Sequence, residues 1–406
     1  MRTRLTRLAA ICLGAATVGG CWTQPGWGPE HRANNPFDGG TNVANVDELA
    51  ESWRMSGVNG ISPIVFGDYL IVVEGPNLVA RSADRGDVYW SSKIFEPCVG
   101  ACGPAGFDPV VYAPFVDTDR RLHVDYLDPR TQTGVSITYD ILSGAELGRG
   151  TSVRSWNIAE TVRGKESARQ SLGFVPSPLG YFVGLTTDAA TAVLYFGATQ
   201  PVSFPPPVIV GSHAFAVVGS DLFRVPLACG SPCNATPVGS IADAPVRHLV
   251  AIDDDSLAVT TNAGTFEVFN VDGNPEWSAT GSAHLSAATV GNGHVFVGTQ
   301  TGVLAYPIAG CGSATCTAAW QMPTDAAVAR QPAISGQVVY AATSFGVVSA
   351  FSTADCGAAT CASLIDLDSN PAGAEVTAAI AAGPIVAGGR VFVILTTGDV
   401  VAFERP

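Results

Sequence analysis

Cysteine is the residue type in this 406-residue chain whose spacing points most directly to chemistry. Apart from Cys12 and Cys21 near the start, eight cysteines form four close pairs: Cys98/Cys102, Cys229/Cys233, Cys311/Cys316 and Cys356/Cys361. An even number of cysteines in an exported chain predicts disulfides. Each disulfide would close a loop of about five residues, worth roughly 2 kcal/mol, and would hold the tip of a hairpin. Zinc is the alternative, but a four-cysteine site requires two pairs from different parts of the chain to meet.

Other residues that could do chemistry are scattered. Asp253-Asp254-Asp255 offers clustered oxygens of the kind that calcium prefers, but aspartates are also typical of tight turns, as at Asp117 and Asp119. The six histidines have no metal-ligand spacing, and the sequence contains no nucleophile elbow, zinc-protease motif or phosphate-binding loop. We therefore expect no catalytic residue, no metal and no cofactor.

The first twenty residues have the order of an export signal. Arg2, Arg4 and Arg7 precede an apolar run, 8–18, that is too short to span a bilayer as a mature helix. The run ends in Val18-Gly19-Gly20-Cys21, which resembles a lipobox, the motif at which a signal is cut before a lipid-carrying cysteine. An ordinary secretory signal with an incidental cysteine is the alternative. We expect a signal peptide at 1–20 and lipidation of Cys21.

The charge and the composition limit the partners. Residues 21–41 are polar and rich in Pro, Gly and Asn, which predicts a tether from the lipid to the domain. The net charge of −14 argues against nucleic acid and against anionic lipid as the main partner. We expect an extracytoplasmic protein, held by its lipid on a bacterial membrane, inner or outer.

The rest of the chain repeats one pattern of apolar strand, glycine turn and apolar strand every 40 to 50 residues. This period is typical of four-stranded blades around an axis, since one blade alone cannot bury both of its faces. The sequence predicts an all-β fold, a single β-propeller over 42–406 of about eight blades, with seven possible. The expected blades are 62–92, 109–149, 172–203, 206–240, 247–279, 284–322, 331–367 and 375–405.

Two segments carry a family resemblance. Residues 139–147, Tyr-Asp-Ile-Leu-Ser-Gly-Ala-Glu-Leu, and 79–90, which ends in Trp90, resemble the PQQ-like repeat of quinoprotein-like propellers. Trp277 and Trp320 occupy the same place as Trp90. The resemblance implies that these tryptophans dock between neighbouring blades. It also implies that the strand at 45–53 completes the last blade, so that N- and C-terminal strands close the ring.

The resemblance leaves the function open. A lipid-anchored propeller of this size is similar to the propeller lipoprotein of the β-barrel assembly machinery, which implies a non-catalytic scaffold whose partner is an envelope or membrane protein. The alternatives are a propeller that binds a small ligand or saccharide and, third, a PQQ-dependent dehydrogenase. Such dehydrogenases have adjacent cysteines at their site, and no Cys-Cys dipeptide occurs here.

Overall fold

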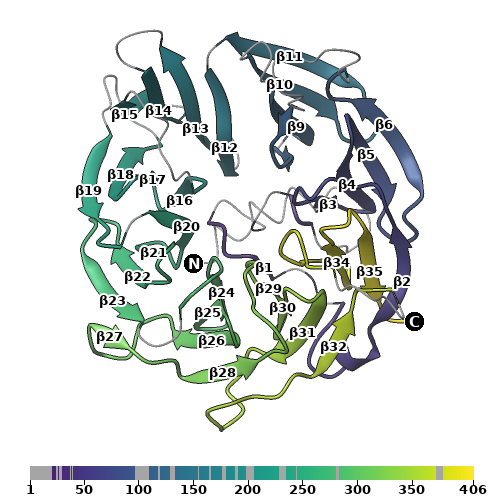
Figure 1. The fold of residues 1–406 in the computed structure, drawn as a ribbon, viewed down its shortest axis with the longest axis vertical. Helices are drawn as coiled ribbons and strands as arrows, with labels where there is room; N and C mark the ends of the chain where they lie inside the picture. The colour runs from purple at the N-terminus through teal and green to yellow at the C-terminus, as the bar shows by residue number, and fades with distance from the viewer. Residues whose placement is uncertain are drawn as a thin grey trace.

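The computed structural model confirms an all-β propeller. It describes residues 21–23, 26, 30–36, 38, 40–96, 109–117, 119–128, 133–153, 155–163, 166–175, 180–187, 191–197, 205–227, 235–243, 245–279, 283–371 and 378–406; of the residues 152–204, only the backbone is described. The described strands pair into eight sheets, which stand around a ring (Figure 1). We number these sheets blades 1 to 8 in chain order. No helix in the described ranges is long and apolar enough to cross a membrane.

Blades 1 to 4 contain the strands β3 to β19. Blade 1 is β3 (Ile64–Phe66), β4 (Tyr69–Glu74), β5 (Asn77–Ser82) and β6 (Val88–Lys93). Blade 2 is β7 (Val110–Val111), β8 (Phe115–Val116), β9 (Arg121–Asp128), β10 (Thr133–Asp140) and β11 (Glu146–Val153). Blade 3 is β12 (Ser155–Arg163), β13 (Glu166–Val175), β14 (Gly180–Thr187) and β15 (Thr191–Gly197). Blade 4 is β16 (Val208–Val210), β17 (His213–Val218), β18 (Asp221–Pro226) and β19 (Thr236–Ser240).

Blades 5 to 8 contain the later strands and two early ones. Blade 5 is β20 (Val246–Ala251), β21 (Ser256–Thr261), β22 (Phe266–Asn270) and β23 (Pro275–Ala279), with β27 (Thr315–Cys316) added. Blade 6 is β24 (Thr289–Gly291), β25 (His294–Thr299), β26 (Gly302–Pro307) and β28 (Trp320–Pro323). Blade 7 is β29 (Ala333–Ser335), β30 (Val338–Ala342), β31 (Val347–Ser352) and β32 (Ile365–Asp368), with β1 (Asn34–Asn35) added. Blade 8 is β33 (Ile385–Ala387), β34 (Arg390–Ile394), β35 (Val400–Glu404) and β2 (Ala50–Met55).

The first and last parts of the chain close the ring, as the sequence predicted. β2 follows the short 3₁₀ helix η1 (Val46–Glu48) and pairs antiparallel with β35, the last strand. Because the N-terminal strand supplies the outer edge of blade 8, this blade is built from both ends of the chain. The pairing fixes blade 8 beside blade 1 without leaving an open gap in the ring of strands (Figure 1).

The hydrophobic core lies between neighbouring blades. Short strands such as β24 and β30 are buried along their whole length, because they face a second blade on each side. One apolar cluster joins blades 1 and 2 and includes Ile71, Trp90 and Ile137. Similar clusters join blades 4 and 5, blades 5 and 6, and blades 6 and 7. Burial by stacking explains why the sequence shows continuous apolar runs rather than strict alternation.

Blade 3 differs from the sequence prediction. The expected range, 172–203, begins inside β13, whereas the first strand of the blade, β12, begins at Ser155. The prediction was wrong because it relied on short apolar runs with glycine turns. β12 and β13 read Ser-Trp-Asn-Ile-Ala-Glu-Thr-Val-Arg and Glu-Ser-Ala-Arg-Gln-Ser-Leu-Gly-Phe-Val, which are mostly polar.

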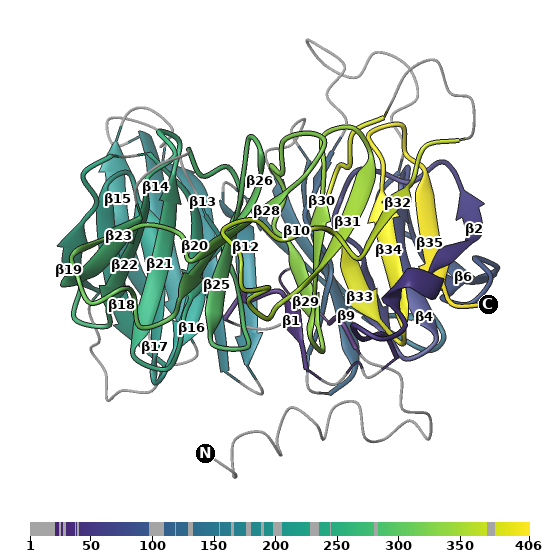
Figure 2. The same cartoon turned by 90° about the horizontal axis from the view of Figure 1, so that it is seen from below.

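The interpretation of residues 21–41 as a tether is wrong for their described part. The described residues 30–36, 38, 40 and 41, called the strap below, lie against the innermost strands (Figures 1 and 2). The backbone nitrogens of Ala251, Val290 and Ile334 donate to the strap carbonyls of residues 30, 32 and 33 at 2.8–3.0 Å. β1 within the strap pairs parallel with β29. The polar composition misled the prediction, because the strap satisfies its backbone groups on strands rather than in water.

Candidate functional site

The predicted docking tryptophans contact the following blade. Trp90, on the outer strand β6 of blade 1, donates from Nε1 to the carbonyl of Ile141 in blade 2 at 3.0 Å. Trp277 of blade 5 lies 5.9 Å from the ring of Tyr306 in blade 6. Trp320 of blade 6 is buried in the apolar cluster that blade 7 completes. All three side chains are at most 9% exposed, so their contacts fit a structural role rather than an open ligand platform.

A fourth tryptophan also contacts the following blade, where blade 8 meets blade 1. Trp53 lies in β2, the outer strand of blade 8, and donates from Nε1 to the carbonyl of Ala83 in blade 1 at 3.1 Å. A methyl group at Gly86 would lie 3.1 Å from its ring. In the sequence, Trp53 belongs to the expected strand at 45–53, for which no docking role is predicted. Its position inside an outer strand, like that of Trp90, is the signal that could have identified it.

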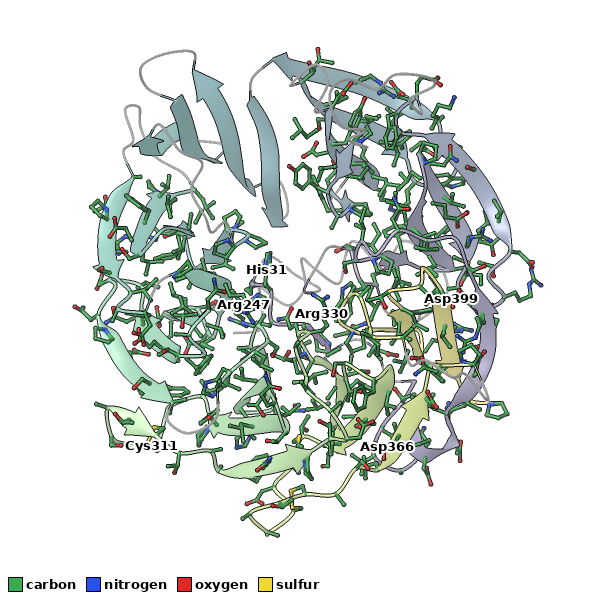
Figure 3. The ribbon with its side chains drawn as sticks, in the orientation of Figure 1. His31, Arg247, Cys311, Arg330, Asp366 and Asp399 are labelled. Carbon is green, nitrogen blue, oxygen red and sulfur yellow. A yellow bond between two sulfur atoms is a disulfide. The ribbon has the colours of Figure 1, made fainter. Side chains whose placement is uncertain are left out.

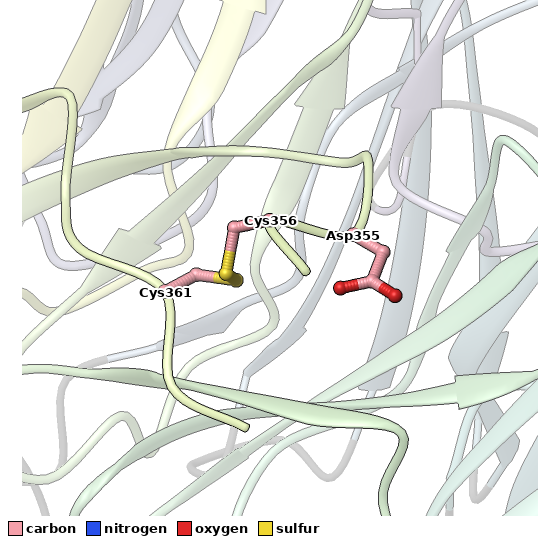
Figure 4. A group of neighbouring side chains, drawn as sticks. All are labelled: Asp355, Cys356 and Cys361. Carbon is pink, nitrogen blue, oxygen red and sulfur yellow. A yellow bond between two sulfur atoms is a disulfide. The ribbon is translucent and has the colours of Figure 1, made fainter. Parts of the chain in front are cut away.

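Two of the four predicted cysteine pairs lie in described residues, and both are disulfides, Cys311–Cys316 and Cys356–Cys361. Cys98, Cys102, Cys229 and Cys233 lie outside the described residues. The carboxylate of Asp355 lies beside the second disulfide (Figure 4). The sulfur atoms of this group are bonded to each other and offer no thiolate, and Asp355 accepts a hydrogen bond from the backbone nitrogen of Gly357 at 2.8 Å. The arrangement is a braced turn rather than a zinc centre.

The disulfide loops do more than hold hairpin tips, which is all that the sequence led us to expect. The loop closed by Cys311–Cys316 contains β27, which pairs parallel with β23, the outer strand of blade 5. In the next repeat, Gln321 of β28 bonds the backbone of Ala359 at 2.9 Å and of Cys361 at 2.8 Å. Each loop therefore leaves its own blade and covers the outer edge of the preceding one. These disulfides brace contacts between blades.

The aspartate clusters are turns. Asp253 accepts a hydrogen bond from the backbone nitrogen of Asp255 at 2.8 Å. Asp117 accepts from the backbone nitrogen of Asp119 at 2.9 Å and contacts His123 at 2.9 Å. Burial would raise the pKa of Asp117, but the hydrogen bonds from His123 and from the backbone outweigh it and lower that pKa. Both clusters form the local side-chain-to-backbone bonds that favour turns.

Cys21, the predicted lipid carrier, is 8% exposed and packs with the apolar cluster of blades 1 and 2. Its sulfur is in a disulfide. A thioether to a lipid and a disulfide exclude each other on one sulfur atom. Next to it, Trp22 bonds the backbone of Val65 in β3, with nitrogen-to-oxygen distances of 2.7 and 2.9 Å. The start of the described chain is therefore held at the inner strand of blade 1.

Basic side chains meet at the centre of the ring. Arg247 projects from β20 of blade 5, Arg330 lies just before β29 of blade 7, and both point toward the centre near His31 of the strap (Figure 3). Burial lowers the pKa of His31 to about 4. Burial, followed by the charge of Arg247, also lowers the pKa of His248 to about 4. Nothing in the sequence singles these residues out, because they are far apart in the chain and match no motif.

Comparisons with known proteins agree with the propeller. Residues 219–406 match the family model described as outer membrane protein assembly factor BamB. Among curated proteins, none matches the chain in sequence. The fold resembles the computationally designed Ika8 protein, with a TM-score of 0.61, 10% identity, and 87% of this chain and 98% of that chain covered.

Two further solved structures superpose on the chain. The crystal structure of BamB from Moraxella catarrhalis has a TM-score of 0.55 and 13% identity, with 88% of this chain and 99% of that chain covered. Quinohemoprotein alcohol dehydrogenase from Comamonas testosteroni gives 0.48 and 13%, with 97% and 82% covered, and nothing is argued from a score that low. The chain is thus a PQQ-like β-propeller similar to BamB.

Proposed function

We propose that this protein is a non-catalytic scaffold of the bacterial cell envelope, which binds envelope or membrane proteins through its propeller. The observation that supports this most is the match of residues 219–406 to the model of an outer membrane protein assembly factor. The superposition on BamB supports the propeller as its platform. A closed ring of blades offers rigid outer edges and turns on which a partner can dock.

The outer side of blades 1 and 2 is the part of the described surface that suits a protein partner best. Val88 and Tyr89 on β6, Leu142 after β10 and Leu147 on β11 are each about half exposed. The turn that carries Leu142 lies against β6, since Ser92 Oγ donates to the carbonyl of Gly144. These exposed apolar side chains lie on or beside the outer strands of two neighbouring blades, where a partner could dock. We call these four residues the apolar rim.

Replacing Tyr89 with aspartate is expected to reduce capture of the partner roughly tenfold or more, because a charge at an interface centre must be desolvated without a partner. The measurement is crosslinking in intact cells, with quantification of co-purified envelope proteins. Phe345→Asp is the matched control, since Phe345 is 52% exposed and lies in blade 7. If both variants capture equally less partner, the contact lies elsewhere. If Tyr89→Asp and the unchanged chain recover the same amount of every envelope protein, the apolar rim is not the binding surface.

A lipid on Cys21 is part of this proposal, and it requires that the Cys21 disulfide be absent from the exported protein, because one sulfur atom cannot hold both. Cleavage before Cys21 would remove Cys12 and leave an odd number of cysteines, which cannot all pair. If Cys21 carries the lipid, the remaining eight are the four close pairs. Because Trp22 is held at β3, the acyl chains would leave the protein beside the inner strand of blade 1. A single chain binds membranes only marginally, so the several acyl chains of a lipoprotein would be needed for stable anchoring.

Cys21→Ser is expected to move the protein from the membrane fraction to the soluble fraction. The intact mass of the unchanged protein should show the added acyl groups. Cys12→Ser, which alters only the segment removed by cleavage, serves as the control and should leave the mass of the mature protein unchanged. The lipid anchor would be refuted if the mature protein carries no acyl groups and both variants stay in the membrane fraction.

A further inference from the structure

Two arginines at the centre of the ring have no carboxylate partner among the described residues. Arg247 donates from Nε to Asn262 Oδ1 and from Nη1 to the carbonyl of Leu285, both at 3.1 Å. Arg330 donates from Nε to the carbonyl of Ile380 at 3.3 Å. All of these acceptors are uncharged, and both arginine side chains are exposed. Each guanidinium keeps N–H donors that these bonds do not use.

Arg247 and Arg330 occupy equivalent positions in their blades. Arg247 lies four residues before Ala251, and Arg330 lies four residues before Ile334. Ala251 and Ile334 are the residues at which the strap bonds the innermost strands of blades 5 and 7. Figure 3 shows both side chains near the centre of the ring.

Among the arginines whose side chains are described, Arg32, Arg120, Arg121, Arg247 and Arg330 have no carboxylate partner, in a chain with a net charge of −14. Seven other arginines in the described part each pair with a carboxylate: Arg54, Arg81, Arg85, Arg149, Arg224, Arg390 and Arg405. Although the protein has many carboxylates, its two central arginines donate hydrogen bonds only to uncharged groups among the described residues. Positive charge that is not compensated within the fold attracts an anion from outside.

His248 adds an unsatisfied group beside the arginines. Its Nε2 is buried and has no hydrogen-bond partner in the described part of the chain. Burial and the charges of Arg247 and Arg330 lower the pKa of His248 to about 4, and the Leu285 carbonyl opposes this shift. The imidazole of His248 is therefore neutral at pH 7. Arg247 directly precedes His248 in the chain, and the Leu285 carbonyl that accepts from Arg247 also contacts this imidazole. A buried polar atom without a partner is costly and is often satisfied by a ligand or water.

We propose that Arg247 and Arg330 bind an oxyanion, the carboxylate or phosphate group of a small ligand, at the centre of the ring. Guanidinium groups bind both kinds of anion through paired N–H donors. His248 Nε2 offers a further hydrogen bond to the ligand. Because the strap lies along one end of the innermost strands, the ligand enters from the other end. The site does not depend on the scaffold role.

Titration calorimetry of the purified protein at low salt tests the site, with inorganic phosphate and citrate as probes and glucose as a neutral comparison. At least one anion is expected to bind, and glucose is not. Binding of phosphate alone identifies a phosphate site, and binding of citrate alone identifies a carboxylate site. Absence of binding by both anions, or equal binding of glucose, overturns the proposal.

Variants locate the binding. Arg247→Gln and Arg330→Gln are each expected to weaken the anion roughly tenfold or more, as loss of a charged hydrogen bond does. Arg85→Gln, which alters an arginine paired with Asp87 far from the centre, should bind as the unchanged protein does. Arg330→Lys keeps the positive charge but lacks the paired N–H donors of a guanidinium group, and it should give an intermediate affinity. This variant provides the test if Arg330→Gln fails to fold. Unchanged affinity in folded Arg247→Gln and Arg330→Lys overturns the site.

Discussion

Replacing Trp90 with alanine is expected to lower the free energy of unfolding by about 3–5 kcal/mol, the range measured for large buried aromatics. Trp90 is 9% exposed and belongs to the cluster that joins blades 1 and 2. Its Nε1 donates to Ile141 at 3.0 Å, so the variant loses a hydrogen bond between blades as well as apolar contacts. Trp277 and Trp320 also dock blades, but their buried Nε1 atoms have no partner in the described part of the chain.

Urea unfolding of the purified protein measures the effect, and the neighbouring residue provides its control. Tyr89 is 48% exposed on the same strand and packs against Tyr69 with ring centroids 5.0 Å apart, so Tyr89→Ala should cost about 0.5–1.5 kcal/mol, less than Trp90→Ala. Trp90→Phe keeps part of the buried area and should lose less than Trp90→Ala. If Trp90→Ala and Tyr89→Ala unfold at the same urea concentration, Trp90 does not couple the blades.

Gly144 explains why the contact is specific. Its backbone φ is +69°, a conformation that favours glycine, and a Cβ there would lie 2.5 Å from the Trp90 ring. The sequence reading found both partners, since the segments 79–90 and 139–147 carry the family resemblance. Local turn chemistry and a large aromatic at a fixed place in the repeat are visible in a sequence. The propeller, its closure by the terminal strands and the buried tryptophans could therefore be predicted.

The strap and the centre of the ring could not be predicted. The strap has the composition of a linker, and nothing local shows that Asn35 Nδ2 would donate to the carbonyl of Val386 at 2.9 Å, across 351 positions. Arg247 and Arg330 lie in different repeats and converge only because the ring brings their strands to one axis. Residues that only the fold brings together show no periodic pattern or fixed spacing in the sequence.

The free energy of unfolding is expected to fall by about 2–3 kcal/mol between pH 7 and pH 4.5 because of His31 alone. Burial lowers the pKa of His31 from 6.5 to about 4, so the unfolded chain binds a proton at a pH where the folded chain does not. Stability from this group is complete above pH 6.5 and is lost as the pH falls toward 4. The strap carries the effect, since the His31 carbonyl accepts a hydrogen bond from Gln331 at 2.6 Å.

His31→Asn separates this contribution from that of the carboxylates and of His248, which titrate in both proteins. The backbone of His31 has a φ of 55°, which asparagine adopts more readily than most residues, so the variant should fold. Urea unfolding of both proteins at pH 7 and pH 4.5 gives the comparison. His31→Asn should lose about 2–3 kcal/mol less than the unchanged chain over this interval. Parallel losses in the two proteins would mean that His31 is not held neutral by burial and that the strap does not respond to acid.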